Sequence, residues 1–252
     1  KNFIDQFFKG LTAKTKMIFI SHITSSTGLR LPVEEICAIA KEKGLLTFID
    51  GAHGPAQVPV DLQNLQADIY TGACHKWMLT PKGSSFLFVK KEYQHLFDPL
   101  VVSWGYNTAL SSGSQFLDYH QMQGTRDFSA FLCIPEAIHF MQQNDWENVS
   151  LKYRQLTQQN AMELCSLLNA KPLAPITNDF IAQLYSAEIK TKEPERLKNH
   201  LYDDYKIEIP VMRHGEKVYL RYSLNAFNTQ RDLDILFDAI TKIKKHTSLI
   251  ED

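Results

Sequence analysis

The sequence has few cysteines, no excess of charge of one sign and no long apolar run. Its four cysteines (Cys37, Cys74, Cys133 and Cys165) form no C-x-x-C pair, which argues against a disulfide framework and favours a reducing, cytoplasmic setting. The 27 basic and 28 acidic residues give a formal net charge of −1, so neither nucleic acid nor a membrane surface is an expected partner. There is also no signal-peptide core near the start and no apolar run long enough to span a bilayer.

Several common site motifs are missing as well. The sequence contains no G-x-G-x-x-G, no G-x-x-x-x-G-K-[ST], no H-E-x-x-H and no G-x-S-x-G, which are the usual signatures of dinucleotide sites, P-loops, zinc proteases and α/β-hydrolases. The pair Cys74-His75 lacks the further spaced ligands that a zinc site needs. No metal site is therefore expected.

The first half of the chain alternates strand and helix patterns. A helix is expected from Pro32, with Gly44 just past its end. Strand-like apolar runs cover Met17–Ile23, Leu45–Ile49, Asp68–Gly72 and Ser85–Lys90. Strands separated by helical or long connections predict an α/β fold with a mostly parallel sheet. The connection from Gly72 to Ser85 is too short for a parallel return, so the last of these strands should be antiparallel.

The second half predicts a long loop and then a smaller α/β unit. Residues Asp98 to Gly124 look irregular, and such stretches are usually functional. The later elements expected are helices at Phe128–Gln142 and from Asp145 to Leu168, with Met162 among the apolar positions of the second, strand Ile181–Ile189, helix Pro194–Tyr205, strands Ile207–Met212 and Val218–Leu224, and a final helix with a capping box of Thr229 and Asp232. We expect two domains, residues 1–144 and 145–252.

Two polar groups follow the ends of consecutive predicted strands. Asp50 comes directly after Leu45–Ile49, and Lys76 lies four residues beyond Gly72. Open α/β sheets bind their ligands at this edge. An acid and a lysine that converge there suit pyridoxal phosphate, which is held as a lysine Schiff base with an acidic partner for its ring nitrogen. The alternatives are a turn or cap role for Asp50 and a solvated surface role for Lys76.

Longer motifs surround both groups. They are Phe48-Ile49-Asp50-Gly51-Ala52-His53-Gly54, Tyr70-Thr71-Gly72-Ala73-Cys74-His75-Lys76-Trp77, Thr80-Pro81-Lys82-Gly83, Gln123-Gly124-Thr125-Arg126-Asp127, and Leu220-Arg221-Tyr222-Ser223 with Phe227-Asn228-Thr229. In this order, from about Met17 to Ile243, they resemble the class V aminotransferase family and within it the isopenicillin N epimerase-like branch. The resemblance implies the fold-type I fold of pyridoxal-phosphate enzymes, here the later part of the large domain and the C-terminal small domain.

The resemblance also implies roles for residues near the lysine. Lys76 would form the Schiff base and later move the Cα proton, and Asp50 would keep the ring nitrogen protonated. His53 would hydrogen-bond the phenolic oxygen, at a position where other branches carry Gln. His75 resembles the histidine on the phosphate side of the cofactor. Ala73 stands where many members have Ser or Asn, so one phosphate donor is missing.

Residues farther along the chain complete the implied site. Thr24 and Ser25 stand where relatives place polar residues beside the ring, although such a cluster can also be a simple loop. Thr125 matches a residue that reaches the phosphate of the neighbouring subunit in a homodimer, with a turn at a helix start as the alternative. Arg221 would bind the substrate carboxylate with its planar fork, with a surface position as its alternative; Phe227 stands where Tyr is common.

The resemblance points to an enzyme that acts on an amino acid. An epimerase or aminotransferase fits better than a cysteine desulfurase or other lyase, because desulfurases need a reactive cysteine in the C-terminal domain. None follows Cys165, and the Val211–Lys217 loop has none. A second hypothesis is a non-catalytic fragment that gives only structural or dimer contacts. Family members carry a long region before the strand at Met17–Ile23, so we expect a fragment that is inactive alone.

Overall fold

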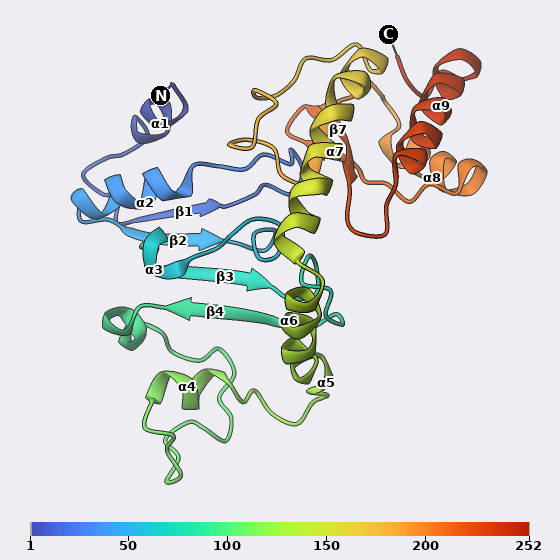
Figure 1. Ribbon diagram of the computed structural model, residues 1–252. Helices are drawn as coiled ribbons and strands as arrows, with labels where there is room; N and C mark the ends of the chain where they lie inside the picture. The colour runs from blue at the N-terminus through green and yellow to red at the C-terminus, as the bar shows by residue number, and fades with distance from the viewer. Residues whose placement is uncertain (1, 252) are drawn as a thin grey trace.

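Four strands form the first sheet, in the order β1-β2-β3-β4 (Figure 1). The computed structural model describes residues 2–251. The strands are β1 (Met17–Ser21), β2 (Leu46–Asp50), β3 (Ile69–Ala73) and β4 (Ser85–Val89). The first three are parallel, and β4 is antiparallel to β3. The sequence-based prediction of a mostly parallel sheet with one antiparallel strand is therefore confirmed.

One face of this sheet packs against α2 (Val33–Glu42). The helix begins at Val33 with Pro32 as its cap residue, one position later than expected, and Gly44 follows its end with φ +66°. The inward side chains of β1 and α2, such as Ile18 and Ile36, share one apolar cluster. The other shorter elements of this half are α1 (Asn2–Phe8), α3 (Leu62–Leu65) and a 3-10 helix at Lys91–Leu96.

The opposite face of the sheet is open at β1. Side chains alternate between the two faces of a strand, so Met17 and Phe19 point away from the apolar cluster that holds Ile18 and Ile20. Met17 is 46% exposed and Phe19 is 62% exposed. The ring of Phe19 meets the ring of Phe48 on the neighbouring strand edge to face. An apolar surface therefore continues from β1 to β2 on this face.

The segment between the two halves differs from the sequence-based prediction. The expected loop from Asp98 to Gly124 contains a short helix, α4 (Gln115–His120), whose cap residue Ser114 accepts a hydrogen bond from the Leu117 backbone. The expected single helix at Phe128–Gln142 is two helices, α5 (Ser129–Leu132) and α6 (Ile134–Gln143). Pro135 explains the break, because its ring supplies no N–H and clashes with the carbonyl of the preceding turn.

The second half contains a three-stranded antiparallel sheet in the order β5-β7-β6. The helices and strands of this second half are α7 (Trp146–Leu167), β5 (Leu184–Glu188), α8 (Pro194–Tyr205), β6 (Val211–His214), β7 (Lys217–Ser223) and α9 (Gln230–His246). The predicted bounds of α8 are confirmed, whereas the expected strands at Ile181–Ile189 and Ile207–Met212 are shorter or begin later. The Val211–Lys217 segment is a tight hairpin around Gly215 rather than a loop.

Caps and apolar positions of the long helices were predicted with mixed success. The capping box of Thr229 and Asp232 at the start of α9 is confirmed. Asp145 stands before α7 but caps no backbone N–H; its carboxylate accepts from the Asn148 side chain at 2.6 Å instead. Met162, one of the apolar positions along this helix, is exposed.

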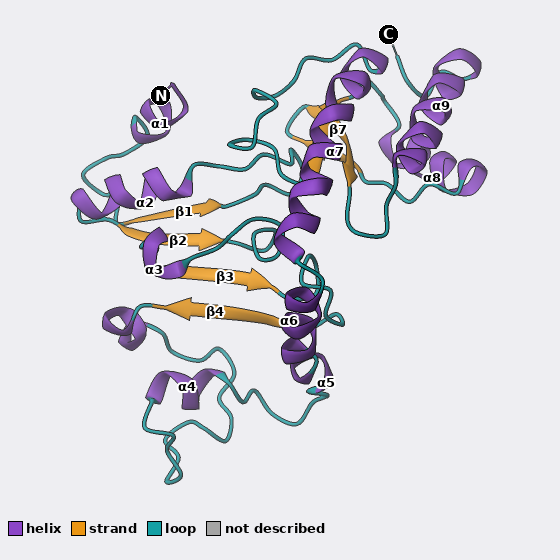
Figure 2. Cartoon of the chain, in the orientation of Figure 1, coloured by secondary structure: helices purple, strands orange, loops and turns teal. Residues whose placement is uncertain are grey.

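The long α7 lies at the end of the first sheet toward which the β1, β2 and β3 arrows point (Figure 2). Residues of this helix contact both the loop after β2 and the second sheet. Trp146 donates its indole N–H to the Ala56 carbonyl at 3.0 Å, and Arg154 donates to the Gln57 carbonyl at 3.1 Å. Farther along, α7 packs on β5, and its Tyr153 belongs to the apolar core of the second sheet. The helix thus fixes the second sheet against the loop that follows β2.

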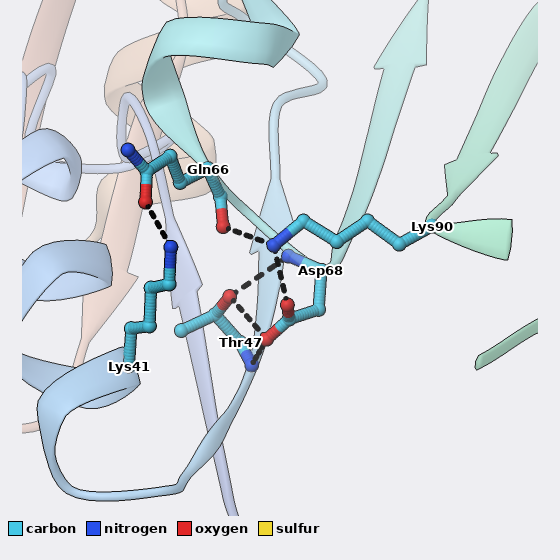
Figure 3. A network of polar contacts seen from close by, with 5 residues as sticks. All are labelled: Lys41, Thr47, Gln66, Asp68 and Lys90. Atoms are coloured by element: carbon cyan, nitrogen blue, oxygen red, sulfur yellow. Dashed lines mark hydrogen bonds and ion pairs between the residues drawn. The ribbon is translucent and has the colours of Figure 1, made fainter. Parts of the chain in front are cut away.

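A polar network ties the other end of the first sheet together (Figure 3). The buried carboxylate of Asp68 accepts hydrogen bonds from the backbone N–H and the hydroxyl of Thr47, at 2.9 and 3.0 Å, and an ion pair from Lys90 at 2.7 Å. Lys90 also donates to the Gln66 carbonyl, and Lys41 donates to the Gln66 side chain. One carboxylate therefore links the starts of β2 and β3 to the end of β4.

We expect Asp68→Ala to lower the free energy of unfolding by about 2–4 kcal/mol, because it leaves the Thr47 N–H without its acceptor and the Lys90 ammonium without its carboxylate partner. Urea unfolding followed by circular dichroism measures this. The matched control is Asp238→Ala, which removes an exposed pair with Lys242 and should change stability little. An effect of Asp68→Ala as small as that expected for the control would show that the network contributes little to stability.

Candidate active site

The carboxyl ends of the three parallel strands meet at one edge and position the candidate site. His22 follows β1, and its backbone N–H donates to the Asp50 carbonyl at 2.8 Å. Gly51 follows β2, and its N–H donates to the Thr71 carbonyl of β3 at 2.9 Å. The sheet ladder therefore continues past the strand ends and holds these segments side by side. Ligands of open α/β sheets bind at such an edge.

The buried ring of Tyr70 sets the shape of the turn after β2. A Cβ on Gly51 would lie 2.1 Å from the ring, and a Cβ on Gly54 would lie 2.4 Å from its hydroxyl oxygen. Any larger residue would force the turn away from β3. The Tyr70 hydroxyl also hydrogen-bonds Nδ1 of His22 at 3.1 Å. The glycines at both positions therefore let the turn after Asp50 lie directly on Tyr70.

Lys76, His53 and Trp77 come together at this edge, from two different connections of the sheet. Nζ of Lys76 lies 3.3 Å from Nε2 of His53. Nε1 of Trp77 donates to the other ring nitrogen of His53, Nδ1, at 3.1 Å. His53 and Trp77 are buried, whereas the Lys76 side chain reaches solvent. The predicted proximity of the His53 turn and the lysine is thus present, with the indole as an additional partner.

The surroundings favour the neutral forms of both groups. The pKa of His53 is lowered to about 3, mainly by burial and also by the positive charges of Lys76 and Arg221. Partial burial also lowers the pKa of Lys76; the Asp50 carboxylate opposes this shift, and the Arg221 guanidinium adds to it. A lysine with a lowered pKa has more free amine near neutral pH, and free amine is the nucleophilic form.

Arg221 reaches the same region from β7 of the second sheet. Its NH1 donates to the carbonyl and to the hydroxyl of Ser25, the latter at 3.2 Å. Its Nε is buried and has no hydrogen-bond partner among residues 2–251. Burial lowers the pKa of this guanidinium as well. The loop after β1 thus holds one end of the fork, and an unpaired N–H remains that an acceptor could use.

The remaining residues singled out from the sequence have varied surroundings. Oδ1 of Asp50 accepts from the Ala52 backbone at 3.0 Å, so the expected turn role is present beside any role toward a ligand. Nδ1 of His75 donates to the Ser84 carbonyl at 2.9 Å. The Thr24 hydroxyl bonds within its own turn, to Thr27 and Leu29. Thr125 is exposed and makes no hydrogen bond to this cluster within the part of the chain that the structure describes.

Sequence reasoning missed three residues of the site. Trp77 was quoted as part of a motif but given no role. Gln57 is fully buried; its Nε2 donates to the His53 carbonyl and its Oε1 accepts from the Gln183 backbone, both at 2.7 Å. His22 is buried, and its pKa is lowered to about 4, mainly by burial. The only signal for Gln57 and His22 was a polar residue within an otherwise apolar stretch.

Within residues 2–251 no group of three or more His, Cys, Asp or Glu side chains is placed to hold a metal ion. Over the same residues, no helix combines the length and apolar character needed to cross a membrane.

The chain is similar in sequence to known proteins over most of its length. Isopenicillin N epimerase from Amycolatopsis lactamdurans is 29% identical over 242 residues, which cover 92% of this chain and 61% of that protein. Putative L-cysteine desulfhydrase 1 from Oryza sativa subsp. japonica is 30% identical over 264 residues, which cover 91% of this chain and 52% of that protein. The chain therefore spans between half and two thirds of the length of these relatives.

Solved structures confirm the expected fold. The apo structure of a cysteine desulfurase from Thermococcus onnurineus NA1 matches with a TM-score of 0.76 at 18% identity, over 91% of this chain and 60% of that one. A cysteine desulfurase from Escherichia coli matches with a TM-score of 0.72 at 19% identity, over 95% of this chain and 61% of that one. The family model described as aminotransferase class-V matches residues 2–236. The chain belongs to the class V aminotransferase family.

Proposed function

We propose that the protein is a pyridoxal-phosphate-dependent enzyme that acts on an amino acid, with Lys76 as the attachment point of the cofactor. The observation that carries the proposal is the position of the Lys76 amine. It lies at the ligand-binding edge of the sheet, 3.3 Å from a buried histidine, and its pKa is lowered mainly by burial. The match to the class V aminotransferase family covers this residue, and the motif around it resembles that of the family's Schiff-base lysine.

The side chains present fit this cofactor. When bound, pyridoxal phosphate supplies an aldehyde that an amine can attack and a ring that withdraws electrons from the substrate. Lys76 supplies an amine with a lowered pKa, and Asp50 supplies a carboxylate near it. The unpaired Nε of Arg221 is a buried donor in need of an acceptor, as a bound anion would provide. These side chains therefore match a ligand that carries both an aldehyde and an acidic group.

Each side chain then has a task in the proposed site. Lys76 would hold the cofactor covalently, and its free Nζ would accept the substrate Cα proton. Asp50 would keep a proton on the ring nitrogen through its negative charge. His53 would donate a hydrogen bond to the phenolic oxygen. His75 would lie on the phosphate side, where Ala73 contributes no side-chain donor.

The two halves of the chain have separate parts in this proposal. Residues 1–144 form part of the cofactor-binding domain, and residues 145–252 form the domain that supplies Arg221. The loop of Thr24 and Ser25 lies between them, and the contact of Ser25 with Arg221 joins the two sides. A homodimer completes the site, with Thr125 of one subunit reaching the phosphate bound by the other. The exposure of Thr125 in a single chain supports this arrangement.

Arg221 sets the class of substrate. A guanidinium binds a carboxylate with two parallel hydrogen bonds, which an amino-acid substrate can accept. Ser25 already positions NH1, so the fork is oriented before the substrate arrives. This preorganisation reduces the entropy lost when the carboxylate binds.

Epimerisation or transamination of the amino acid is the reaction we favour. Persulfide chemistry lacks a suitable nucleophile, because Cys165 lies buried in α7 against the Tyr185 hydroxyl and the hairpin of β6 and β7 has no cysteine. Release of sulfide from cysteine is the second candidate, since relatives named L-cysteine desulfhydrase reach 30% identity. Such an elimination needs a base that removes the Cα proton of the substrate. It does not need a cysteine of the enzyme.

The first test is the site of attachment. Borohydride reduction in the presence of pyridoxal phosphate, followed by peptide mapping, should place the pyridoxyl group on Lys76, and the protein should be yellow before reduction. Lys82→Ala should keep the adduct, and Lys76→Ala should lose it. An adduct on Lys82 or Lys90 would overturn the assignment, and a colourless, unmodified protein would support the non-catalytic hypothesis.

The second test concerns the substrate carboxylate. We expect Arg221→Lys to weaken amino-acid binding by about 2–5 kcal/mol, because a point charge replaces a two-pronged donor at a partly desolvated position. Titration of the cofactor absorbance with amino acids measures this, and the absorbance without substrate should stay the same. Arg213→Lys, at an exposed position of β6, is the control. Unchanged affinity in Arg221→Lys would refute the role.

The third test asks whether residues 1–252 contain all the groups that the proposed reaction needs. We expect residues 1–252 alone to be inactive, a proposal supported by the open apolar face at Met17 and Phe19. Cα-proton exchange of amino acids in deuterated water should be absent for this chain and present for a version extended upstream. Exchange at the same rate in both proteins would show that nothing beyond these residues is needed.

A further inference from the structure

The hydrogen bond between Trp77 and His53 determines which ring nitrogen of His53 carries the proton. An indole N–H can only donate, and it points at Nδ1 over 3.1 Å. Nδ1 must therefore present its lone pair. Burial keeps the ring neutral at physiological pH, so its single proton has to reside on Nε2. In the neutral ring, the tautomer therefore follows from the indole N–H, which can only donate.

The proton on Nε2 faces the Lys76 amine. An ammonium group has three donors and no acceptor, so a charged Lys76 would bring N–H against N–H at the 3.3 Å contact. The neutral amine has a lone pair and can accept the hydrogen bond. The reverse arrangement, in which the ammonium donates to Nε2, needs the proton on Nδ1, where it would oppose the indole N–H of Trp77.

We infer that Trp77 is a positioning residue that holds His53 in its Nε2–H tautomer and thereby favours the free-amine form of Lys76. The inference rests on the proposed function in one respect only: in that proposal the free amine of Lys76 is the form that would attack the cofactor aldehyde. The same Nε2–H is the donor that His53 needs for the phenolic oxygen of the cofactor. One indole N–H therefore prepares both the nucleophile and the hydrogen bond that follows.

Other charges near Lys76 act independently of this contact. Asp50 favours the ammonium, whereas Arg221 and burial disfavour it. At His53, Lys76 and Arg221 add to the effect of burial. Within residues 2–251, neither Asp50 nor Arg221 hydrogen-bonds a ring nitrogen of His53, as Trp77 does. The contribution of Trp77 should therefore be separable from theirs by a substitution that changes no charge.

The decisive variant is Trp77→Phe, which keeps an aromatic ring and removes the N–H. We expect the titration midpoint of Lys76 to rise by about one pH unit, so that its acylation near neutral pH slows about tenfold. The measurement is the rate of acylation of the cofactor-free chain by an amine-selective reagent at a series of pH values, followed at each lysine by mass spectrometry. Lys82 serves as an internal reference. An unchanged Lys76 midpoint in folded protein would overturn the inference.

Two further variants test the route through His53. Trp146→Phe removes another indole N–H, which is bonded to Ala56 in the loop after β2, and should leave the Lys76 midpoint unchanged. In a His53→Phe background, Trp77→Phe should have no further effect on Lys76. An equal rise with and without His53 would show that Trp77 acts by packing and not through the tautomer.

A measurement on the unsubstituted protein covers the case in which Trp77→Phe does not fold. ¹⁵N spectra of histidine-labelled protein distinguish protonated from unprotonated ring nitrogens, and the His53 signals are assigned by their loss in His53→Gln. We expect a protonated Nε2 and an unprotonated Nδ1; the opposite pattern would overturn the inference. Both experiments omit the cofactor, so they stand even if the borohydride test assigns the adduct elsewhere.

Discussion

The space taken by the Tyr70 ring is the constraint on which the candidate site depends. The ring is fully buried at the edge of the sheet, its hydroxyl bonds His22 after β1, and its surface excludes any side chain at Gly51 and Gly54 after β2. One aromatic side chain thus fixes the ends of three strands relative to one another. The positions of Asp50 and His53 follow from where this turn lies, and the lysine follows from the connection out of β3 itself.

Much of the fold could be predicted from the sequence because it depends on local patterns. Apolar runs identified all four strands of the first sheet, and a short connection established that β4 is antiparallel. The capping box of α9 could be read directly, since a cap involves residues only three positions apart. The split between α5 and α6 was missed because the apolar pattern continues across it, although Pro135 interrupts the backbone hydrogen bonds.

The sequence indicated which ionisable side chains meet at the candidate site. It did not indicate the contacts that affect their pKa values and protonation. Lys76 and His53 lie together as the motifs indicated. The partners of Gln57 could not be foreseen, because one of them lies 126 residues away along the chain. The protonation of His53 depends on the angle and distance of the Trp77 N–H, which no spacing of residues encodes. Composition and periodicity identify groups, whereas their chemistry depends on three-dimensional neighbours.

The amide of Gln57 has a mechanical consequence. Its nitrogen holds the carbonyl of His53, and its oxygen holds the backbone at Gln183, just before β5. The amide is planar, its nitrogen can only donate and its oxygen can only accept, so the two ends cannot exchange partners. The side chain therefore holds the two backbone segments at a fixed separation. A displacement of the second sheet would therefore be transmitted to the histidine that contacts Lys76. Through this amide, the surroundings of the Lys76 amine depend on the position of the second sheet.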